Sequence, residues 1–336
     1  MGENRRSMTS VRRNANVSSP ARHDAGDIVK RMQTHTAAAV ALVLALAVPV
    51  ASAAAPLCGT RDTPPPVWEH VVWIWFENHG SDQVIGSPDA PFMNRTLAAG
   101  CGLATNAHNE THPSLPNYIA ATSGLPPGAL GRWKHDCNAV GPCRTRAANL
   151  FAQAPSWAAY AESMPKPCVH FFTGLYAASH NPAVYYRTLA DCPAHDVPYG
   201  QLQADLDADT LPAFVFIVPN MCHSMHNCSI ATGDAWLAKT VRALAASPAY
   251  QRGTMALFVT FDEGEDGGSD QCTHNTGDSG CHVPIFVVSP STPTGTRSAT
   301  LFNHYSLLRT TEEMLGISSV LGYARHENSM RSAFNL

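Results

Sequence analysis

The chain contains four continuous runs of mainly apolar residues. They span residues 71–76, 214–218, 255–261 and 283–288. Runs of this length without strict polar alternation predict strands that are buried on both faces, as in a parallel sheet. Helix-like stretches occupy residues 155–163, 234–246 and 304–315. Strands that alternate with helices predict an α/β fold with a doubly wound, mostly parallel sheet and helices on both of its faces.

The first 55 residues have the pattern of a targeting segment. A polar and basic stretch ends at Lys30-Arg31, an apolar run extends from Ala37 to Val50, and Ala51-Ser52-Ala53 provides small residues for cleavage. These features are typical of a secretory signal peptide. The apolar run is shorter than the roughly 20 residues of a membrane-spanning helix, and an uncleaved anchor is the alternative interpretation. We therefore expect a secreted protein without a stable membrane span after cleavage.

Residues 56–336 are predicted to form a single domain with a loop-rich insertion around residues 125–200. All ten cysteines of the chain lie in this part. An even number of cysteines behind a signal peptide predicts up to five disulfides. Three closely spaced pairs indicate short local loops, namely Cys137/Cys143, Cys222/Cys228 and Cys272/Cys281. A zinc site built from cysteines is the competing interpretation, although the chain contains no C-x-x-C pair.

The composition is that of an acidic globular protein. Of the 336 residues, 45% are hydrophobic and 14% are charged. The first 53 residues hold 7 basic and 3 acidic side chains, so 15 of the 22 basic and 23 of the 26 acidic residues remain, which gives a net charge of −8. Proteins bind nucleic acids largely through basic patches. The charge balance of the predicted mature chain therefore argues against nucleic acid as a partner.

Polar residues follow three of the apolar runs. Glu77-Asn78 come directly after the first, Pro219-Asn220 after the second and Asp262-Glu263 after the third. Ligands of open α/β sheets bind outside the carboxyl ends of the strands, so we expect these side chains to converge. One such pair alone often does no more than end a strand. Three together favour a metal site, in which oxygen ligands select Ca²⁺, Mg²⁺ or Mn²⁺ and a histidine ligand would admit Zn²⁺.

Ser114 lies in a second constellation, His112-Pro113-Ser114-Leu115-Pro116-Asn117-Tyr118. A short helix that ends at Gly124 is predicted after it. A serine in front of a helix is most often an N-cap. The N-terminus of a helix also attracts phosphate, through its free N–H groups and the helix dipole. Spacing alone leaves open whether Ser114 caps the helix or contacts a phosphate.

With these motifs in this order, the chain resembles the bacterial phosphoesterase family of secreted acid phosphatases and non-specific phospholipases C, in the alkaline phosphatase superfamily. The resemblance covers roughly residues 68–316. It rests on Glu77-Asn78, the motif at 112–118, Pro219-Asn220 with His226 and Gly233-Asp234, Asp262-Glu263-Gly264, and His282-Val283-Pro284 before Ser289-Pro290. Within the family, the chain is most similar to actinobacterial secreted acid phosphatases that act on phosphoinositides.

The resemblance implies a role for each motif residue. Ser114 is the implied nucleophile, and His226 and His282 are the implied catalytic histidines near the phosphate. The implied phosphate-binding side chains are His112, Asn117 and Asn220. The implied metal ligands are Glu77, Asn78, Asp262 and Glu263. The chain has Asp-Glu-Gly where the two-zinc enzymes of the superfamily have Asp-His, and this difference favours one divalent ion, with Ca²⁺, Mg²⁺ or Mn²⁺ ahead of Zn²⁺.

The resemblance further implies a secreted, metal-dependent phosphomonoesterase that works through a phosphoserine, with a phosphoinositide as one candidate substrate. A phospholipase C or another phosphodiesterase is the alternative, with a phospholipid head group as substrate. It would share the site and differ in the pocket, which residues 125–200 are expected to shape. An inactive secreted binding protein is an alternative of another class. That alternative predicts loss of Ser114 or of the acidic residues, and all of them are present.

Overall fold

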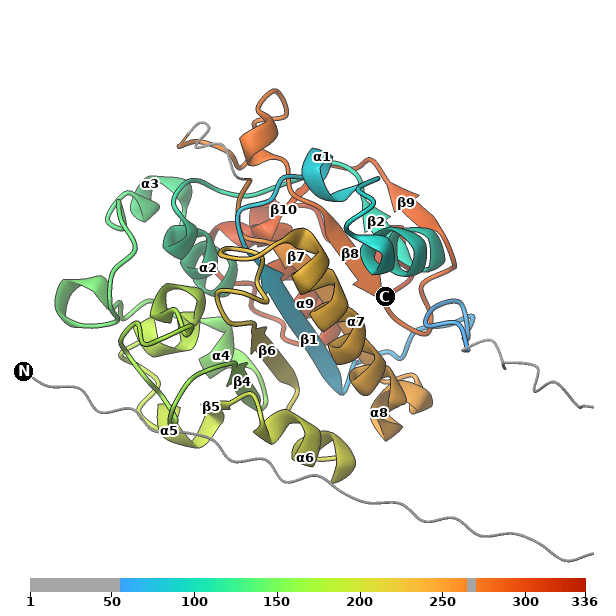
Figure 1. The fold of residues 1–336 in the computed structure, drawn as a ribbon, viewed down its shortest axis with the longest axis horizontal. Coiled ribbons are helices and arrows are strands. Elements are labelled where there is room, and N and C mark those ends of the chain that lie inside the picture. The colour runs from blue at the N-terminus through green and yellow to red at the C-terminus, as the bar shows by residue number, and fades with distance from the viewer. Residues whose placement is uncertain (1–54, 265–269) are drawn as a thin grey trace, which may run out of the picture. The chain divides into compact units, whose positions relative to one another are not determined.

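An eight-stranded sheet forms the centre of the structure, a computed structural model that describes residues 55–264 and 270–336 (Figure 1). The strand order is β5-β4-β6-β1-β7-β8-β2-β9. β8 is antiparallel to both of its neighbours, and the other neighbouring pairs are parallel. The strands are β1 (His70–Phe76), β2 (Gly102–Ala104), β4 (Trp157–Ala161), β5 (Asp196–Pro198), β6 (Phe214–Val218), β7 (Met255–Phe261), β8 (Ile285–Val288) and β9 (Thr296–Ser298). The predicted mostly parallel sheet is confirmed.

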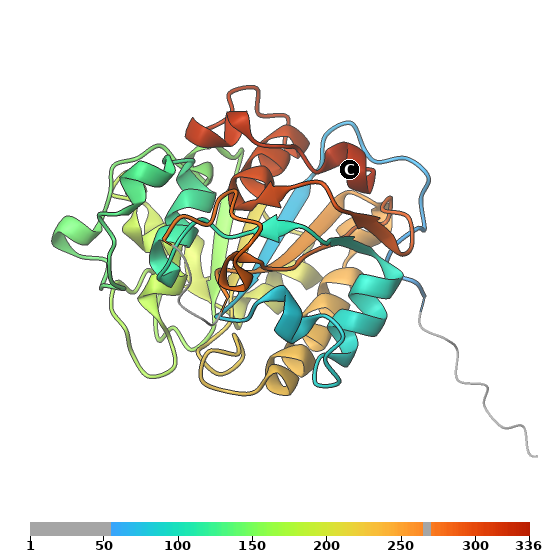
Figure 2. The ribbon, with the colours of Figure 1, turned by 90° about the horizontal axis from the view of Figure 1, so that it is seen from above.

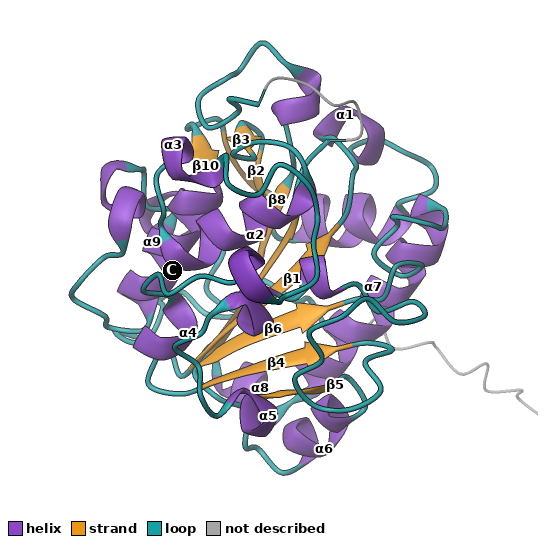
Figure 3. Ribbon diagram, turned by 90° about the vertical axis from the view of Figure 1, so that its left-hand side faces the viewer, coloured by secondary structure: helices purple, strands orange, loops and turns teal. Residues whose placement is uncertain are grey.

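Side chains of the central strand β1 alternate between two apolar layers. Trp73 and Trp75 belong to one layer, and Ile74 and Phe76 belong to the other. The first layer includes α2 (Ser114–Ser123), α4 (Leu150–Gln153) and α9 (His304–Met314). The second includes α6 (Gln201–Asp207), α7 (Ile230–Ala246) and α8 (Pro248–Arg252). Figure 3 shows α2 and α9 on one side of the sheet and α7 on the other.

Short elements complete the fold. A second, two-stranded sheet pairs β3 (Ala107–His108) with β10 (Phe302–Asn303). The short helices and helical turns are α1 (Ser81–Val84), η1 (Met93–Ala98), α3 (Pro127–Leu130), η2 (Gly141–Cys143), η3 (Ala178–His180), η4 (Pro182–Tyr185), α5 (Cys192–His195), η5 (Ser279–Cys281), η6 (Gly322–His326) and α10 (Arg331–Phe334).

Most of the predicted elements are present, and one is wrong. The four apolar runs form β1, β6, β7 and β8, and three of the four predicted helices form α7, α9 and, before Gly124, α2. The helix predicted at 155–163 is wrong, because Trp157–Ala161 is the strand β4, which pairs with β6 and β5. Three alanines give this segment a helical propensity. Burial between two strands overrides that weak preference.

The start of α7 also differs from the prediction, because the helix begins at Ile230 and contains Gly233. A Cβ atom on Gly233 would lie 2.5 Å from the Met225 Cγ atom and 2.8 Å from the His223 carbonyl oxygen. Glycine therefore lets the first turn of α7 approach the loop that follows β6. This close approach, and not a position in front of the helix, explains the glycine.

All ten cysteines form disulfides, as the even count predicted. The pairs are Cys58–Cys101, Cys137–Cys143, Cys168–Cys192, Cys222–Cys228 and Cys272–Cys281. The three closely spaced pairs indeed close short local loops. The alternative of a cysteine zinc site is wrong, because a disulfide leaves no thiolate to bind the ion.

The segment 125–200 is part of the sheet, since it contributes the neighbouring strands β4 and β5. Figure 2, seen from above, shows this segment in green and yellow-green on one side of the domain. Residues 1–54 of the predicted targeting segment lie outside the described residues. In the part of the chain that the structure describes, no helix is both long and apolar enough to cross a membrane.

Candidate active site

Three carboxylates meet where β1 and β7 end, and we call Glu77, Asp262 and Glu263 the carboxylate cluster. The two strands pair along their whole length, and the Asp262 N–H donates to the Phe76 carbonyl at 3.0 Å. The Asp262 Oδ1 atom accepts hydrogen bonds from the backbone N–H groups of Asn78 at 3.1 Å and of Glu263 at 2.8 Å. Neighbouring parallel strands thus bring together residues that are 184 positions apart in the sequence.

Burial gives this cluster its electrostatic character. Glu77 and Asp262 are fully buried, and Glu263 is 7% exposed. Burial raises the pKa of Glu77 well above its ordinary value, and the nearby charge of Asp262 raises it further. Burial and the charge of Glu263 together raise the pKa of Asp262 to about 7. The cluster therefore favours bound protons or a bound cation over three bare negative charges.

Three buried oxygen atoms of this region accept no hydrogen bond among the described residues: Asp262 Oδ2, Asn78 Oδ1 and Glu263 Oε2. Of these, Glu263 Oε2 lies in an ion pair with His112, and the other two have no such partner. Asn78 adopts a left-handed backbone conformation with φ of 52°, which is uncommon for a residue other than glycine. Buried polar atoms are almost always paired in folded proteins. Unpaired oxygens beside clustered carboxylates fit the ligand set of a hard divalent cation.

Ser114 is the first residue of α2, and its hydroxyl faces the carboxylate cluster. The Ser114 Oγ atom lies 3.1 Å from Glu77 Oε2 and 3.4 Å from Glu263 Oε1. Pro113 occupies the N-cap position of the helix. The interpretation of Ser114 as an N-cap is therefore wrong. The hydroxyl is instead placed to give its proton to a carboxylate.

Asn117 holds the loop in front of Ser114. Its Oδ1 atom accepts from the N–H groups of Glu110 at 2.9 Å and Thr111 at 3.0 Å. Its amide nitrogen donates to the carbonyls of Thr111 at 2.8 Å and Pro113 at 3.1 Å. Because Asn117 is fully buried and both ends of its amide bind the loop, these contacts fix the backbone around Ser114. Its implied contact with phosphate stays a prediction.

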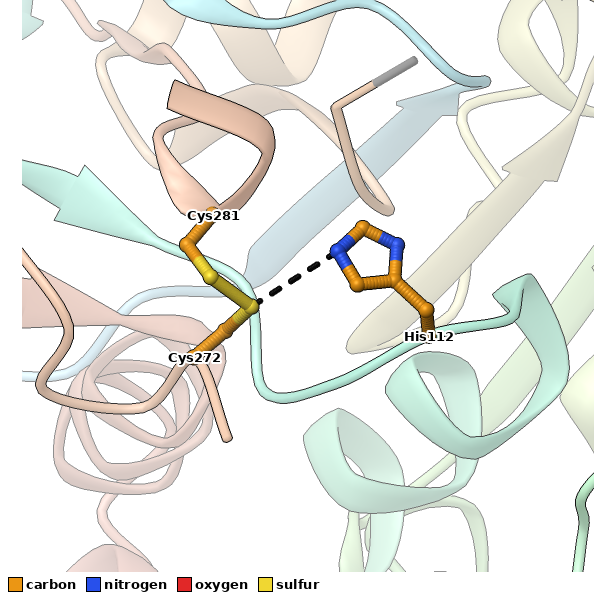
Figure 4. A group of neighbouring side chains, drawn as sticks. All are labelled: His112, Cys272 and Cys281. Atoms are coloured by element: carbon orange, nitrogen blue, oxygen red, sulfur yellow. Dashed lines mark hydrogen bonds between the residues drawn. A yellow bond between two sulfur atoms is a disulfide. The ribbon is translucent and has the colours of Figure 1, made fainter. Parts of the chain in front are cut away.

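His112 contacts the carboxylate oxygen of Glu263 that does not face Ser114. Its Nδ1 atom is 2.8 Å from Glu263 Oε2, and its Nε2 atom is 3.7 Å from the Cys272 sulfur (Figure 4). Burial alone would lower the pKa of His112, but Glu263 outweighs it and the net shift of the pKa is upward. His112, Cys272 and Cys281 are grouped closely enough to hold a metal. The disulfide between the two cysteines, seen in Figure 4, prevents this.

Two side chains that the sequence analysis did not assign contact Glu77. The Tyr118 hydroxyl donates to Glu77 Oε1, and His180 Nδ1 lies 3.3 Å from the same oxygen. Tyr118 is part of the predicted 112–118 motif, whereas His180 belongs to η3 and follows no predicted strand. Burial and the nearby His226 lower the pKa of His180 to about 3, so its imidazole is neutral and able to bind a metal.

His226 extends this group toward solvent. Its ring lies 5.8 Å from the ring of His180, centre to centre, and its Nδ1 atom is 2.8 Å from the Asn227 Oδ1 atom. Potential ligand atoms of Glu77, His180 and His226 all lie within 4.8 Å of one another. His226 is the exposed member of the three. The structure thus places one implied catalytic histidine beside the carboxylate cluster.

His282 and Asn220 make their observed contacts in neighbouring loops. The His282 Nε2 atom lies 3.1 Å from the Thr105 carbonyl, and its ring stacks on His108 at 5.4 Å. The Asn220 Oδ1 atom accepts from the N–H groups of Cys222 at 3.0 Å and His223 at 2.9 Å. Asn220 therefore shapes the loop after β6. The implied catalytic and phosphate-binding roles of these two residues stay predictions.

A cavity of about 880 Å³ opens beside His112. Segments 127–134 and 270–275 contribute to its walls, together with Thr111 and Tyr323. Lys134 and His274 also line it. Its size lies within the range of small-molecule sites, which is about 300–1,000 Å³. Since His112 contacts Glu263, the cavity adjoins the carboxylate cluster and offers room for the part of a substrate that does not react.

Comparison with known proteins gives matches along most of the chain. A model of the phosphoesterase family matches residues 74–318. A phosphatidylinositol-3-phosphatase of Mycobacterium tuberculosis is 31% identical over 273 residues, which are 81% of this chain and 84% of that protein. An acid phosphatase of Aspergillus fumigatus is 26% identical over 259 residues, 74% of this chain and 55% of that protein. A solved alkaline phosphatase superfamily protein from Vibrio parahaemolyticus shares the fold, with a TM-score of 0.50, 12% identity and coverage of 82% of this chain and 73% of that chain.

Proposed function

This chain belongs to the phosphoesterase family and is a hydrolase of phosphate esters, and from that premise we propose that it is a metal-dependent phosphomonoesterase with Ser114 as its nucleophile. One observation carries the proposal. A serine hydroxyl that opens a helix lies 3.1 Å and 3.4 Å from two buried carboxylates. A structural serine has no need of such acidic surroundings, whereas a nucleophile needs a base to take its proton.

The residues present fit a divalent metal ion. Glu77, Asp262 and Glu263 would hold it, with the unpaired Asn78 oxygen as a fourth oxygen ligand. When bound, the ion supplies positive charge that stabilises the phosphate oxygens and the serine alkoxide. Oxygen ligands favour Ca²⁺, Mg²⁺ or Mn²⁺. His180 beside Glu77 would add a nitrogen ligand and admit Zn²⁺.

The chain's own groups account for the proton and bond changes. Ser114 transfers its hydroxyl proton to a neighbouring carboxylate as its Oγ atom attacks phosphorus. The new bond to Oγ forms while the bond to the ester oxygen breaks. In the proposal, His226 gives a proton to the departing alkoxide, because it is the solvent-facing imidazole of the group. Neutral His226 then takes a proton from water, which attacks the phosphorus of the phosphoserine. The bond between phosphorus and Oγ breaks, phosphate leaves, and the carboxylate returns its proton to Oγ.

The substrate we propose is a phosphate monoester whose alcohol part occupies the cavity beside His112. The similarity to a phosphatidylinositol-3-phosphatase supports a phosphoinositide head group as one such substrate. We also propose that the protein acts outside the cell. Five disulfides support this location, because disulfides form and persist in oxidising compartments.

Hydrolysis assays with and without a chelator test the proposal. The purified protein should hydrolyse a chromogenic phosphate monoester, lose turnover after chelation and recover it with one of Ca²⁺, Mg²⁺, Mn²⁺ or Zn²⁺. Full turnover in a verified metal-free preparation would contradict metal dependence. A matched chromogenic diester and a phospholipid test the alternative of a phosphodiesterase or phospholipase C. Faster hydrolysis of either than of the monoester would favour that alternative.

A further inference from the structure

An unusual group of exposed apolar side chains lies on the segment 125–200. Among the described residues, five large apolar side chains are exposed, and four of them are on this segment. We call these four the apolar tip: Val140 (42% exposed), Phe171 (53%), Phe172 (44%) and Leu175 (45%). Isolated exposed apolar residues are ordinary. Several of them gathered on one surface usually mark an interaction site.

Backbone contacts hold the apolar tip in a defined shape. The Phe172 N–H donates to Asn138 Oδ1 at 2.9 Å, and the Ala139 N–H donates to the His170 carbonyl at 2.8 Å. These bonds place residues 138–140 beside residues 170–172. Thr173 and Tyr176 exchange two backbone hydrogen bonds at 3.0 Å around the turn. The side chains are therefore exposed on an ordered turn and not by a loop that has failed to pack.

The disulfides anchor both halves of this turn. Cys137–Cys143 closes the loop that carries Val140, and Cys168 joins Cys192 just before the first phenylalanine. Gly174 has a φ of 58°, a conformation that glycine adopts without steric cost. Such a turn presents apolar side chains at little further cost in conformational entropy when they bind.

The segment that carries the apolar tip is basic, in a protein that is otherwise acidic. Residues 130–190 contain 6 basic and 2 acidic side chains, a net charge of +4. The rest of residues 54–336 has 9 basic and 21 acidic side chains, a net charge of −12. Arg187 donates to the Gly141 carbonyl, and Arg132 donates to the Pro142 carbonyl at 2.7 Å. Both guanidinium groups thus lie next to the loop of Val140.

The cations near the tip are not neutralised by acidic side chains within the described part of the chain. Arginine ion pairs there involve Arg252 and Arg309, which lie outside residues 130–190. Arg132, Arg144 and Arg187 instead donate to backbone carbonyls. Carbonyl oxygens carry no full charge, so the positive field of the segment remains available to an anionic partner.

The apolar tip is also connected to the candidate active site. The Leu175 carbonyl accepts from the Met221 N–H at 2.9 Å, on the loop that carries His226. His180, which lies 3.3 Å from Glu77, follows the same turn by five residues. Asp136, just before the loop of Val140, accepts from the Leu115 N–H in α2 at 3.0 Å. A surface bound to the tip therefore lies close to the site of hydrolysis.

We propose that the apolar tip inserts into the surface of an anionic phospholipid membrane, with the surrounding arginines against the lipid phosphates. Apolar side chains that enter the acyl region and cations at the head groups form the usual combination of an interfacial anchor. A stable protein partner would need about 800 Å² of buried surface on each side, more than four side chains on a turn and the loop beside it provide. The proposal rests on the proposed function only in its consequence, that the enzyme acts on phosphate esters within the membrane surface.

Vesicle binding tests the anchor directly. The purified protein should bind vesicles of phosphatidylcholine mixed with phosphatidylserine, and a variant with Phe171→Ser and Phe172→Ser should bind about 10²-fold more weakly. Val67 is the matched control, because it is equally exposed at 52% but lies outside the segment. The Val67→Ser variant should bind as the unmodified protein does. Equal binding by all three proteins would overturn the proposal.

Charge substitutions test the lipid class. Changing Arg132 and Arg187 together to Gln should weaken binding to the anionic vesicles by about 30-fold. Changing both to Lys should preserve binding, because the charge remains while the guanidinium hydrogen bonds are lost. Circular dichroism should show that both variants are folded. If the Lys variant loses as much affinity as the Gln variant, or if vesicles of phosphatidylcholine alone bind equally well, the anionic membrane is the wrong partner.

Two further measurements separate this inference from the proposed function. Hydrolysis of a soluble monoester should be unchanged in the Phe171→Ser, Phe172→Ser variant, while hydrolysis of a phosphoinositide in vesicles should fall with binding. Vesicle binding without any phosphatase activity would support the anchor and contradict the proposed function. Light scattering examines a second copy of the chain as the occupant. A dimer that the double variant converts to a monomer, without vesicle binding, would overturn the proposal.

Discussion

The carboxylate cluster and the apolar tip place their side chains in opposite ways. Glu77 and Asp262 are fully buried and directly follow β1 and β7, the most extensively paired strands of the sheet. Phe171 is 53% exposed and lies on a turn anchored by disulfides. One region gathers carboxyl groups in the interior, and the other places apolar side chains beside arginines at the surface.

The difference shows that rigid strand ends and surface loops suit different functions. Catalytic geometry has to be held within fractions of an ångström, and the ends of paired strands in a packed core provide that rigidity. A surface that meets a soft or variable partner has no such requirement, and loops carry it well. In the proposals made above, chemistry resides in the sheet and recognition in the segment 125–200. Substitutions should therefore separate the two properties.

Removing the proposed nucleophile should produce the largest effect. Ser114→Ala should lower kcat/KM for a soluble monoester by about 10⁴-fold, because the proposed phosphoserine forms on the Ser114 Oγ atom. Vesicle binding and thermal unfolding should be nearly unchanged, since Pro113 and not Ser114 occupies the N-cap position. Ser123→Ala in the same helix, whose hydroxyl donates to the Ile119 carbonyl, is the control and should retain activity. If Ser114→Ala keeps near-normal kcat, water becomes the better candidate for the attacking group.

Asp262→Asn should lower kcat/KM by on the order of 10²- to 10³-fold and stabilise the metal-free protein. Burial raises the pKa of Asp262 to about 7 in the folded state from an ordinary value of 3.8. The folded protein therefore binds a proton that the unfolded chain releases, so the free energy of unfolding falls as the pH rises through this window. Asparagine removes the cost of the buried charge above about pH 7.

Thermal unfolding above that pH, with chelator and with added metal, measures the change. The metal-free variant should melt higher than the metal-free unmodified protein and gain little from the ion. Asp207→Asn on α6 is the control, because that carboxylate is exposed and accepts from Gln203. A variant that is stabilised by metal as strongly as the unmodified protein would remove Asp262 from the proposed ligands.

Tyr118→Phe should have a smaller effect, about tenfold on activity or metal affinity. The Tyr118 hydroxyl donates to Glu77 and so orients a carboxylate that is itself next to Ser114. Phenylalanine keeps the ring packed on Trp75 at 4.9 Å and removes the donor alone. Isothermal titration with the activating ion should show the loss in affinity. Unchanged affinity and unchanged kcat/KM would mean that the chemistry does not depend on this hydrogen bond.

Glu110→Gln should change stability while leaving activity unaltered. Burial raises the pKa of Glu110 to about 8 from 4.5, although it belongs to neither the carboxylate cluster nor the apolar tip. Between these values the folded protein binds more protons than the unfolded chain, so the free energy of unfolding falls with rising pH, by up to about 1.4 kcal/mol per pH unit. Glutamine keeps the acceptor for the His304 N–H, now at 3.0 Å, and should flatten that slope.

Denaturant unfolding across the same pH range measures the slope, and the unmodified protein is the reference. A variant with an identical slope would show that Glu110 is not the titrating group. A large loss of kcat/KM would instead extend the chemical site to Glu110. Either result would change whether Glu110 is counted among the buried acids that affect stability or among those that affect catalysis.

The sequence predicted the central sheet and the family well, for reasons that are local. Residues 71–76 and 255–261 are apolar along their whole length because both of their faces are buried, and no other structure explains such runs as simply. The family inferred from the motifs is confirmed. The convergence expected of Glu77 with Asp262 also occurs, because parallel neighbouring strands end at the same edge.

The remainder depends on contacts between distant segments. His180 lies in η3, within the long segment 125–200, and contacts Glu77. No periodic pattern in the sequence of this segment predicts that contact. The helix expected at 155–163 is a strand because of its neighbours β5 and β6, which the segment itself does not encode. Asn117 belongs to the 112–118 motif and was expected to bind phosphate, yet its hydrogen bonds in the structure hold the loop in front of Ser114. A motif identifies a residue without telling which atoms it binds.

The position of β1 in the sheet has a consequence for biosynthesis. Among the described strands it is the first to leave the ribosome, yet its residue Val71 pairs with Phe214 on one side and Ala256 on the other. Most of the chain must therefore be made before either edge of β1 is covered. During that interval its Trp-Ile-Trp-Phe sequence is exposed to other nascent chains, and sheets with such distant pairings fold slowly. A chaperone that binds the early chain until β7 has been synthesised would prevent β1 from associating with other chains.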